Sequence, residues 1–281
     1  MNAKIMDGRA LALELRRALK KKIKENKESP QIAVILVGDN PASEVYVRQK
    51  QKAAQLVGIS LQIERLPNDV SEARLFETQE RLNLDPNICG YILQAPLPFH
   101  LNTFEALRRI DINKDIDCLN PENLGLVAES KARFLPCTPI GIINLLKKYN
   151  VPLKGAVMTI IGRSRIVGRP LALMATTKDA TVIVCHTKTQ DIFKHTREAN
   201  IIIAAAGVPE LIKSDAISEG AVLVDVGINR VDGRLVGDVD FLDCSKKAAL
   251  ISPVPGGVGP MTVVSLLENA YNAWLYQKNR R

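Results

Sequence analysis

Short apolar runs recur along this chain and are separated by segments long enough to form helices. The first half contains QIAVILVG at 31–38, GISLQIERL at 58–66 and ICGYILQ at 88–94. The second half contains VMTII, TVIVC, NIIIAAA and AVLVDV, between residues 157 and 226. Continuous apolar runs are typical of strands that are buried on both faces. Their alternation with helical segments predicts an α/β fold with parallel sheets and right-handed crossovers.

Helices are expected in the segments between these runs. In the first half we predict a basic helix within 9–27, a helix from Ser43, as its cap, to Val57, and a helix over 71–84. In the second half we predict helices at 139–149, 166–177, 190–198 and 261–278. Residues 95–102 and 111–125 are rich in Pro, Asn and Asp, and 251–260 is a Gly/Pro stretch. We predict loops there, the first two lining a ligand crevice at the carboxyl ends of the strands.

The length of 281 residues suits two domains of this class. We predict a boundary near residue 138. The first domain then comprises 1–138 together with a returning C-terminal helix, 261–281, and the second comprises 139–260.

Composition narrows the class of partner. The formal net charge of +8 is concentrated in 9–27 and in the last four residues, and aromatic residues make up only 4% of the chain. A nucleic-acid partner is therefore not expected. Five cysteines without a C-x-x-C pair favour a reducing cytoplasm and argue against a metal site. With neither a membrane-length apolar run nor a secretory signal, we expect no membrane association.

The stretch IIGRSRIVGRP, residues 160–170, lies where a strand would meet a helix. Its glycines, Gly162 and Gly168, do not match the usual G-x-G-x-x-G fingerprint. A hydrolase turn of the form G-x-S-x-G is disfavoured, because bulky Ile166 replaces its second glycine. Two interpretations remain open from this stretch alone. It is an ordinary turn, or it is a pyrophosphate loop in which Ser164 and backbone N–H groups bind an anion at a helix N-terminus.

Arg163 and Arg165 bear on which dinucleotide would bind. A planar guanidinium can hold a 2′-phosphate through two hydrogen bonds. The next strand ends in VCHTKT, which places Thr187 and Lys188 where an NAD site usually has an acidic residue. The residues therefore favour NADP over NAD.

Four polar residues in the first half are candidates for chemistry. Tyr46 and Lys50 are four residues apart in a predicted helix, so they share a face. Gln94 ends a strand, and Asp117 lies in KDIDC. Each alone also fits a structural role, and a single D-x-D pair is weak support for a metal. We predict no metal.

Ten stretches, in order along the chain, are similar to one family. They are YVRQK, LQAPLP, NKDID, PCTPIGI, GRSRIVGRP, TVIVCHTKT, AAAGVP, LVDVGIN, GDVDF and PVPGGVGPMT. Together they resemble the bifunctional methylenetetrahydrofolate dehydrogenase/cyclohydrolase family of one-carbon metabolism. The resemblance runs from about Asp7 to Asn272, and GRSRIVG and PVPGGVGPMT are its most specific parts.

The resemblance implies a folate-binding catalytic domain, a Rossmann-type NADP domain, a folate cleft between them and a homodimer. It implies that Lys50 is the catalytic lysine, that Gln94 tunes it, and that Tyr46 and Asp117 meet the folate. The implied cofactor contacts are Gly162, Arg163, Ser164, Thr187 and Ile228. The loop implied to close over folate and cofactor contains Pro255, Gly256 and Gly257.

The implied reaction is NADP-dependent oxidation of 5,10-methylenetetrahydrofolate to the 5,10-methenyl form, followed by hydrolysis to 10-formyltetrahydrofolate. The hydride step needs alignment rather than a strong base, because the two folate nitrogens stabilise the cation. Ring opening moves protons, and a partly buried lysine beside a neutral glutamine suits that task.

The sequence departs from the family at three places: Ala95 replaces a common leucine, Cys118 a glycine and Ser252 a threonine. Cys118 adds a Cβ to a turn that tolerates none if its φ is positive. The alternative reading is therefore a monofunctional NADP-dependent dehydrogenase with impaired cyclohydrolase activity. A non-catalytic basic binding protein is a third possibility, against which the Tyr46–Lys50 pair argues.

Overall fold

The computed structural model describes residues 3–280. The chain divides into two compact units, each described here by itself. The six-stranded unit contains the chain up to Leu13 and Pro136–Thr262, and the three-stranded unit contains Glu14–Leu135 and the chain from Val263 on. The first strand, β1 (Lys4–Ile5), pairs with a strand of the six-stranded unit. The start of the chain therefore lies with 136–262 rather than with the first predicted domain.

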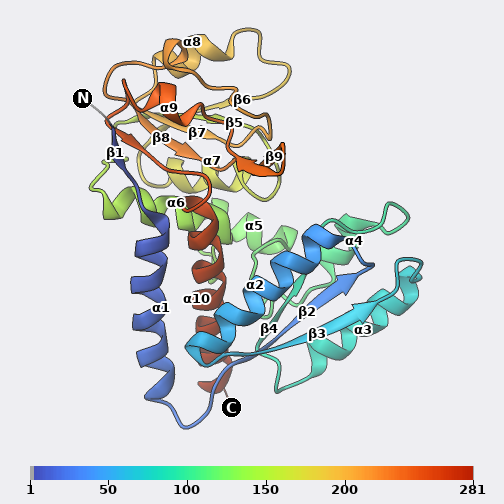
Figure 1. The fold of residues 1–281 in the computed structure, drawn as a ribbon. Helices are drawn as coiled ribbons and strands as arrows, with labels where there is room; N and C mark the ends of the chain where they lie inside the picture. The colour runs from blue at the N-terminus through green and yellow to red at the C-terminus, as the bar shows by residue number, and fades with distance from the viewer. Residues whose placement is uncertain (1–2, 281) are drawn as a thin grey trace. The chain divides into compact units, whose positions relative to one another are not determined.

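The three-stranded unit is built on a parallel sheet in the order β3-β2-β4. Its elements within 14–135 are β2 (Gln31–Val37), α2 (Pro41–Val57), β3 (Ser60–Leu66), α3 (Glu72–Leu84), β4 (Gly90–Leu93), α4 (Thr103–Arg108) and α5 (Pro121–Ala128). All residues of the central strand after Gln31 are buried, as expected for a continuous apolar run between two neighbours. Helix α2 connects the central strand to β3, and α3 connects β3 to β4 (Figure 1).

Two local predictions in this unit are wrong, both because asparagine was not counted as a cap. Helix α2 begins at Pro41, and the Asn40 side chain accepts a hydrogen bond from the N–H of Ser43. Ser43 is therefore a buried residue of the first turn, not the cap. The stretch 111–125, predicted as a loop, contains the start of α5, where Asn120 accepts from the N–H of Glu122. Asparagine favours loops, but it is also among the strongest N-caps.

The six-stranded unit has an all-parallel sheet. Its strands in spatial order are β1, β11 (Leu250–Ile251), β8 (Val222–Asp225), β7 (Ile201–Ala204), β5 (Val157–Ile161) and β6 (Thr181–Cys185). Figure 1 shows blue β1 beside the orange strands, although the two are far apart in the sequence. Both sheets confirm the predicted α/β class.

Helices join these strands, and a small hairpin follows β8. The elements are α6 (Cys137–Lys148), α7 (Gly168–Thr176), α8 (Ile192–Arg197), the 3-10 turn η1 (Ser214–Ala216), hairpin strands β9 (Asn229–Val231) and β10 (Arg234–Val236), and α9 (Phe241–Cys244). Strand β5 has β6 on one side and β7 on the other, so the strand order reverses there. In open parallel sheets, ligands bind at the carboxyl ends of the strands at such a reversal.

Two helices run from the six-stranded unit into the other: α1 (Gly8–Lys24) and α10 (Val258–Lys278). Helix α10 begins earlier than predicted, so part of the expected 251–260 loop is helical. Its Pro260 lies in the first turn, where a missing backbone N–H breaks no helical bond. Across the described residues, no helix is long and apolar enough to cross a membrane.

Candidate active site

The clearest pair of polar side chains in the three-stranded unit is Lys50 and Gln94. Lys50 lies on α2 and is half-buried, and Gln94 follows β4 directly. The Lys50 Nζ donates a hydrogen bond to Gln94 Oε1 at 3.0 Å. The structure thus joins two predicted site residues that are 44 positions apart in the sequence.

Gln94 is oriented by the backbone that follows it. Its Nε2 donates to the carbonyl oxygen of Ala95 at 2.7 Å, which turns Oε1 toward the lysine. The Gln94 N–H donates to the carbonyl of Ile35 on β2, at 3.0 Å. The Ala95 side chain is exposed, so the contact that holds the amide is made by its backbone oxygen. That contact does not depend on which side chain stands at position 95.

Tyr46 and Asp117 are placed by the elements that carry them. Tyr46 lies one turn before Lys50 on α2, with 40% of its surface exposed. Asp117 is half-buried, two residues after Asp115, which forms a parallel bridge with Tyr91 of β4. The segment carrying Asp117 therefore runs alongside β4, and Asp117 and Gln94 both lie beyond this bridge in the carboxyl direction.

The sequence analysis missed Asp115, which holds this segment in place. It is fully buried, and its carboxylate accepts hydrogen bonds from the N–H groups of Leu119 and Asn120 and from the Asn123 amide, all within 3.0 Å. Burial raises the pKa of the Asp115 carboxyl, while these hydrogen bonds oppose the rise. The signal in the sequence was KDID itself, in which the first aspartate lies two residues before the candidate site residue.

Cys118 has the positive φ under which a Cβ is poorly tolerated at this turn. Its φ is +57°, in the left-handed region. The side chain is fully buried, and its Sγ donates to the carbonyl of Phe134 at 3.3 Å. This position therefore combines a backbone that favours glycine with a packed, hydrogen-bonded thiol.

In the six-stranded unit, residues 162–168 form a tight loop between β5 and α7. Gly162 has a φ of +119°, and a Cβ there would lie 2.2 Å from the carbonyl oxygen of Ala205. A Cβ at Gly168 would lie 2.0 Å from the carbonyl oxygen of Gly162. The hydroxyl of Ser164 accepts from the N–H of Val167 at 3.2 Å. The glycines are thus required for a loop folded closely on itself at the N-terminus of α7.

The neighbouring loop carries Thr187. Strand β6 pairs with β5 so that Cys185 lies opposite Ile161, and the Gly162 N–H donates to the Cys185 carbonyl. Thr187 follows two residues later in a turn, exposed, and Arg163 is exposed on the adjacent loop. Both side chains are therefore available at the same carboxyl edge of the sheet.

Ile228 lies in the loop after β8, with 52% of its surface exposed. Beneath this loop are two buried aspartates that the sequence analysis did not single out, Asp225 and Asp238. Asp225 accepts from the N–H groups of Gly227, Asp238 and Val239. Burial raises the pKa of the Asp225 carboxyl to about 6, the backbone hydrogen bonds oppose this, and the nearby Asp238 adds to it.

The loop 252–257 follows β11 and contains Pro255, Gly256 and Gly257. The Val254–Pro255 peptide is cis, and Gly256 has a φ of +117°. The start of α1 packs on this loop: the Arg9 N–H donates to the Gly256 carbonyl, and a Cβ at Gly8 would lie 1.9 Å from the Gly257 oxygen.

Ser252, one of the three departures noted in the sequence analysis, is buried at the start of this loop. Its hydroxyl accepts from the Asp225 N–H at 2.8 Å. Threonine carries the same hydroxyl, so this departure keeps the polar contact.

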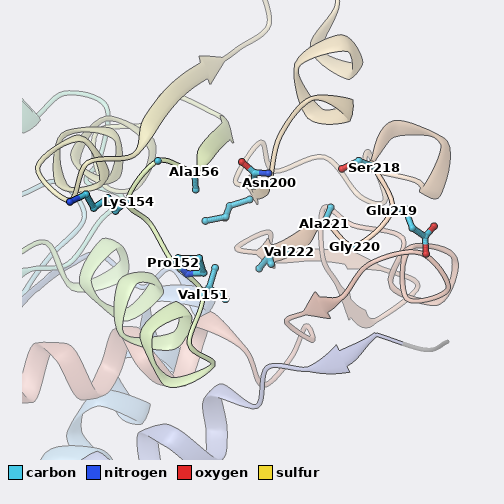
Figure 2. Close-up of a pocket in the computed structure, with 12 residues that line it drawn as sticks. Val151, Pro152, Lys154, Ala156, Asn200, Ser218, Glu219, Gly220, Ala221 and Val222 are labelled. Carbon is cyan, nitrogen blue, oxygen red and sulfur yellow. The ribbon is translucent and has the colours of Figure 1, made fainter.

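A cavity of about 360 Å³ lies at the other end of the six-stranded sheet. Figure 2 shows its lining residues, which include Ala156, Asn200 and Ala221. Each of these three directly precedes a strand, so the cavity is at the amino ends of β5, β7 and β8. It is therefore separate from the loops that carry the predicted cofactor residues, all of which follow strands.

In the part of the chain that the structure describes, the cysteines form no disulfide and no metal cluster. All five cysteines are free thiols and are buried. Within residues 3–280, no group of three or more His, Cys, Asp or Glu side chains is arranged to hold a metal ion.

Comparisons with known proteins cover almost the whole chain. Residues 6–117 match the tetrahydrofolate dehydrogenase/cyclohydrolase catalytic domain, and residues 136–278 match the NAD(P)-binding domain of the same family. The bifunctional protein FolD of Aquifex aeolicus is 49% identical over 278 residues, which cover 97% of this chain and 95% of that protein.

Solved structures agree with these matches. The bifunctional FolD enzyme of Campylobacter jejuni has a TM-score of 0.95 at 44% identity and covers 99% of this chain and 100% of its own. The Trypanosoma brucei enzyme, solved with NADP cofactor and an inhibitor, has a TM-score of 0.94 at 36% identity, with 98% of both chains covered. The chain therefore belongs to the tetrahydrofolate dehydrogenase/cyclohydrolase family, with a catalytic domain and an NAD(P)-binding domain.

Proposed function

We propose that this chain oxidises 5,10-methylenetetrahydrofolate with NADP⁺ and then hydrolyses the methenyl product to 10-formyltetrahydrofolate. The observation that carries the proposal is the Lys50–Gln94 hydrogen bond in a chain of this family. It supports the second activity in particular, because ring opening requires a group that can move protons. The NAD(P)-binding domain match supports the first.

The cofactor residues in this proposal are Gly162, Arg163, Ser164, Thr187 and Ile228. The fit rests on the shape of the 162–168 loop, where glycine leaves backbone close to the space in front of α7. The N-terminus of this nine-residue helix favours an anion such as a pyrophosphate. Arg163 supplies a guanidinium for the 2′-phosphate, and exposed Thr187 a hydroxyl on the adjacent loop.

The dehydrogenase step depends mainly on alignment. NADP⁺, when bound, accepts the hydride, and the two folate nitrogens stabilise the cation that remains. The protein then needs to hold donor and acceptor in one geometry, which can account for several kcal/mol of the barrier. We assign Asp117 and Tyr46 to holding the folate, and the 255–257 loop to closing over the substrate.

The cyclohydrolase step depends on Lys50. A neutral amide partner orients the amine without the strong preference for an ammonium ion that a carboxylate would impose. No ion pair of Lys50 occurs among the described residues, and its hydrogen bond goes to Gln94. Lys50 is therefore placed to exchange a proton with the attacking water or the opening ring.

The test is a spectrophotometric assay with methylenetetrahydrofolate and either NADP⁺ or NAD⁺. NADPH should form, and the methenyl absorbance should then decay. Lys50→Met should slow methenyl hydrolysis by about 10²–10⁴-fold, the usual contribution of a general acid–base. Lys52→Met, exposed two positions along α2, is the matched control. An unchanged hydrolysis rate in Lys50→Met would remove Lys50 from this role, and no NADPH formation by the wild type would remove the function.

The choice of NADP over NAD tests Arg163 separately. Arg163→Ala should raise the KM for NADP⁺ about 10–100-fold and leave the KM for NAD⁺ nearly unchanged, because only the former has a 2′-phosphate. Lys178→Ala, an exposed change of charge beyond the far end of α7, is the control. Equal losses for both cofactors would assign the phosphate to another residue.

We further propose a cytoplasmic homodimer. Support for a second copy comes from β6, an edge strand of the six-stranded sheet. Its Val184 is 36% exposed, and Leu173 of α7, the helix packed on β6, is 38% exposed. An exposed apolar edge strand is a ready surface for pairing with another chain.

A further inference from the structure

The Asp238 side chain ties together two separate loops of the six-stranded unit. It is fully buried. Its Oδ2 accepts from the N–H groups of Ala206 and Gly207, at 2.6 and 2.8 Å, in the loop after β7. Its Oδ1 accepts from the side-chain amide of Asn229, at 2.9 Å, at the start of the hairpin after β8.

Asp225 holds Asp238 in turn. One oxygen of Asp225 accepts from the N–H groups of Gly227 and Asp238, both at 2.9 Å, and the other from Val239 at 3.0 Å. The two carboxylates therefore bind three chain segments: the backbone N–H groups of 206–207 and of 238–239, and, in 227–229, the N–H of Gly227 and the side-chain amide of Asn229. Each is a carboxyl-end loop or is packed against one.

One of these segments borders the 162–168 loop, called the phosphate loop below, directly. A Cβ on Gly162 would lie only 2.2 Å from the Ala205 carbonyl oxygen. Residues 205–207 therefore pack directly against the backbone of that loop. On the other side is the loop that carries Ile228. The residue before it, Gly227, donates to Asp225, and the residue after it, Asn229, donates to Asp238. Asp238 thus lies between the loop assigned to the cofactor phosphates and the loop assigned to its nicotinamide end.

The cradle around the two carboxylates admits no larger group. A Cβ at Gly227 would lie 2.1 Å from Asp238 Oδ1, and a Cβ at Gly237 would lie 1.8 Å from Asp225 Oδ2. Neither glycine has a positive φ, so backbone conformation does not account for glycine at these two positions. Their role is therefore to let the backbone approach these side chains, which is the packing expected where the position of a carboxylate matters.

We propose that Asp238 is a positioning residue for cofactor binding: it fixes the 205–207 loop against the phosphate loop and the 227–229 loop beside it. The inference rests on the proposed use of NADP by this unit. A carboxylate is the side chain that accepts three donors at once, two on one oxygen and one on the other. An amide of the same shape offers one accepting oxygen and places N–H groups against the remaining donors.

The test is Asp238→Asn, with Asp240→Asn as the matched control. Asp240 lies two residues on and caps α9, where its side chain accepts from the N–H of Asp243; within residues 3–280 no hydrogen bond joins that side chain to a cofactor loop. Asp238→Asn should raise the KM for NADP⁺ at least about tenfold and lower dehydrogenase kcat less. Its hydrolysis of supplied methenyltetrahydrofolate should stay within about twofold of the wild type, because that reaction uses Lys50. Asp240→Asn should leave both activities near the wild-type values.

The outcomes separate this inference from the proposed function. A wild type that uses NADP⁺ and an Asp238→Asn variant with an unchanged or lower KM for NADP⁺ would overturn only the inference. Equal loss of both activities in Asp238→Asn would show a general structural role and would also overturn it. If Asp238→Asn does not fold, Asn229→Ala decides: it removes only the Oδ1 donor and should raise the KM for NADP⁺ a few-fold with hydrolysis retained. An unchanged KM would count against the proposal.

Discussion

Cys118 combines two features that rarely occur together: a left-handed backbone, which favours glycine, and a buried side chain. Its left-handed backbone costs a non-glycine residue roughly 1–2 kcal/mol. Its buried thiol, bonded to the Phe134 carbonyl, gives back a similar amount through burial and hydrogen bonding. The two effects offset each other, so a cysteine is tolerated at a position whose backbone favours glycine.

This balance sets an order of stability for two substitutions. Cys118→Gly removes both the backbone cost and the thiol, so its unfolding free energy should stay within about 1 kcal/mol of the wild type. Cys118→Ala keeps the backbone cost and loses the thiol, so it should be less stable by roughly 1–2 kcal/mol. Urea unfolding measures both. A Cys118→Ala variant more stable than Cys118→Gly would show that the left-handed backbone carries little cost here.

Among the elements, helix α1 positions a loop of the proposed site through its first turn. Its first turn meets the 252–257 loop through the Arg9–Gly256 hydrogen bond and the close approach of Gly8 to Gly257. Asp7 caps this turn by accepting from the N–H of Ala10. The start of the helix thus determines where the proposed substrate-closing loop sits.

Gly8→Ala should therefore destabilise the protein, although helix propensity alone would predict stabilisation. Alanine favours a helix by about 1 kcal/mol over glycine, but here its Cβ would lie 1.9 Å from the Gly257 oxygen. We expect a net loss of roughly 1–3 kcal/mol in stability and a raised KM for the folate. Thermal unfolding and steady-state kinetics measure the two.

Gly125→Ala in α5 is the matched control, because nothing lies within 4 Å of the added Cβ. It should be stabilised by up to about 1 kcal/mol, with unchanged kinetics. A stabilised Gly8→Ala variant with normal kinetics would show that the loop does not depend on this contact.

At the scale of the whole molecule, the proposed dimer concerns the edge of the six-stranded sheet. Val184→Lys places a charge on β6, a device by which edge strands avoid pairing. It should convert a dimer into a monomer at micromolar concentration while keeping the unit folded. Light scattering with size-exclusion chromatography measures the mass.

Leu84→Lys is the control, since Leu84 is 72% exposed at the end of α3, in the other unit. This variant should remain a dimer. A dimer that survives Val184→Lys would place the interface elsewhere, and a monomeric wild type would refute the dimer.

The sequence by itself determined the class of fold, the longer strands and helices to within a few residues, and the family. It could do so because burial on both faces of a strand leaves an apolar run, and because motifs such as GRSRIVG are local. It was wrong at Asn40 and Asn120, where a capping residue was read as a loop. It also gave no sign of short elements such as β1, which pairs with β11 and places the start of the chain with 136–262.

Only the tertiary structure decided which distant residues meet. The Lys50–Gln94 bond, the Gly8–Gly257 approach and the Asp238 bonds to the 206–207 backbone each join residues from different elements. Periodicity reports which face of an element is buried, but it carries no information about the partner across the fold. The partners follow from strand order and register, which place the carboxyl-end loops side by side and leave buried donors to be satisfied by whichever carboxylate or amide lies within reach.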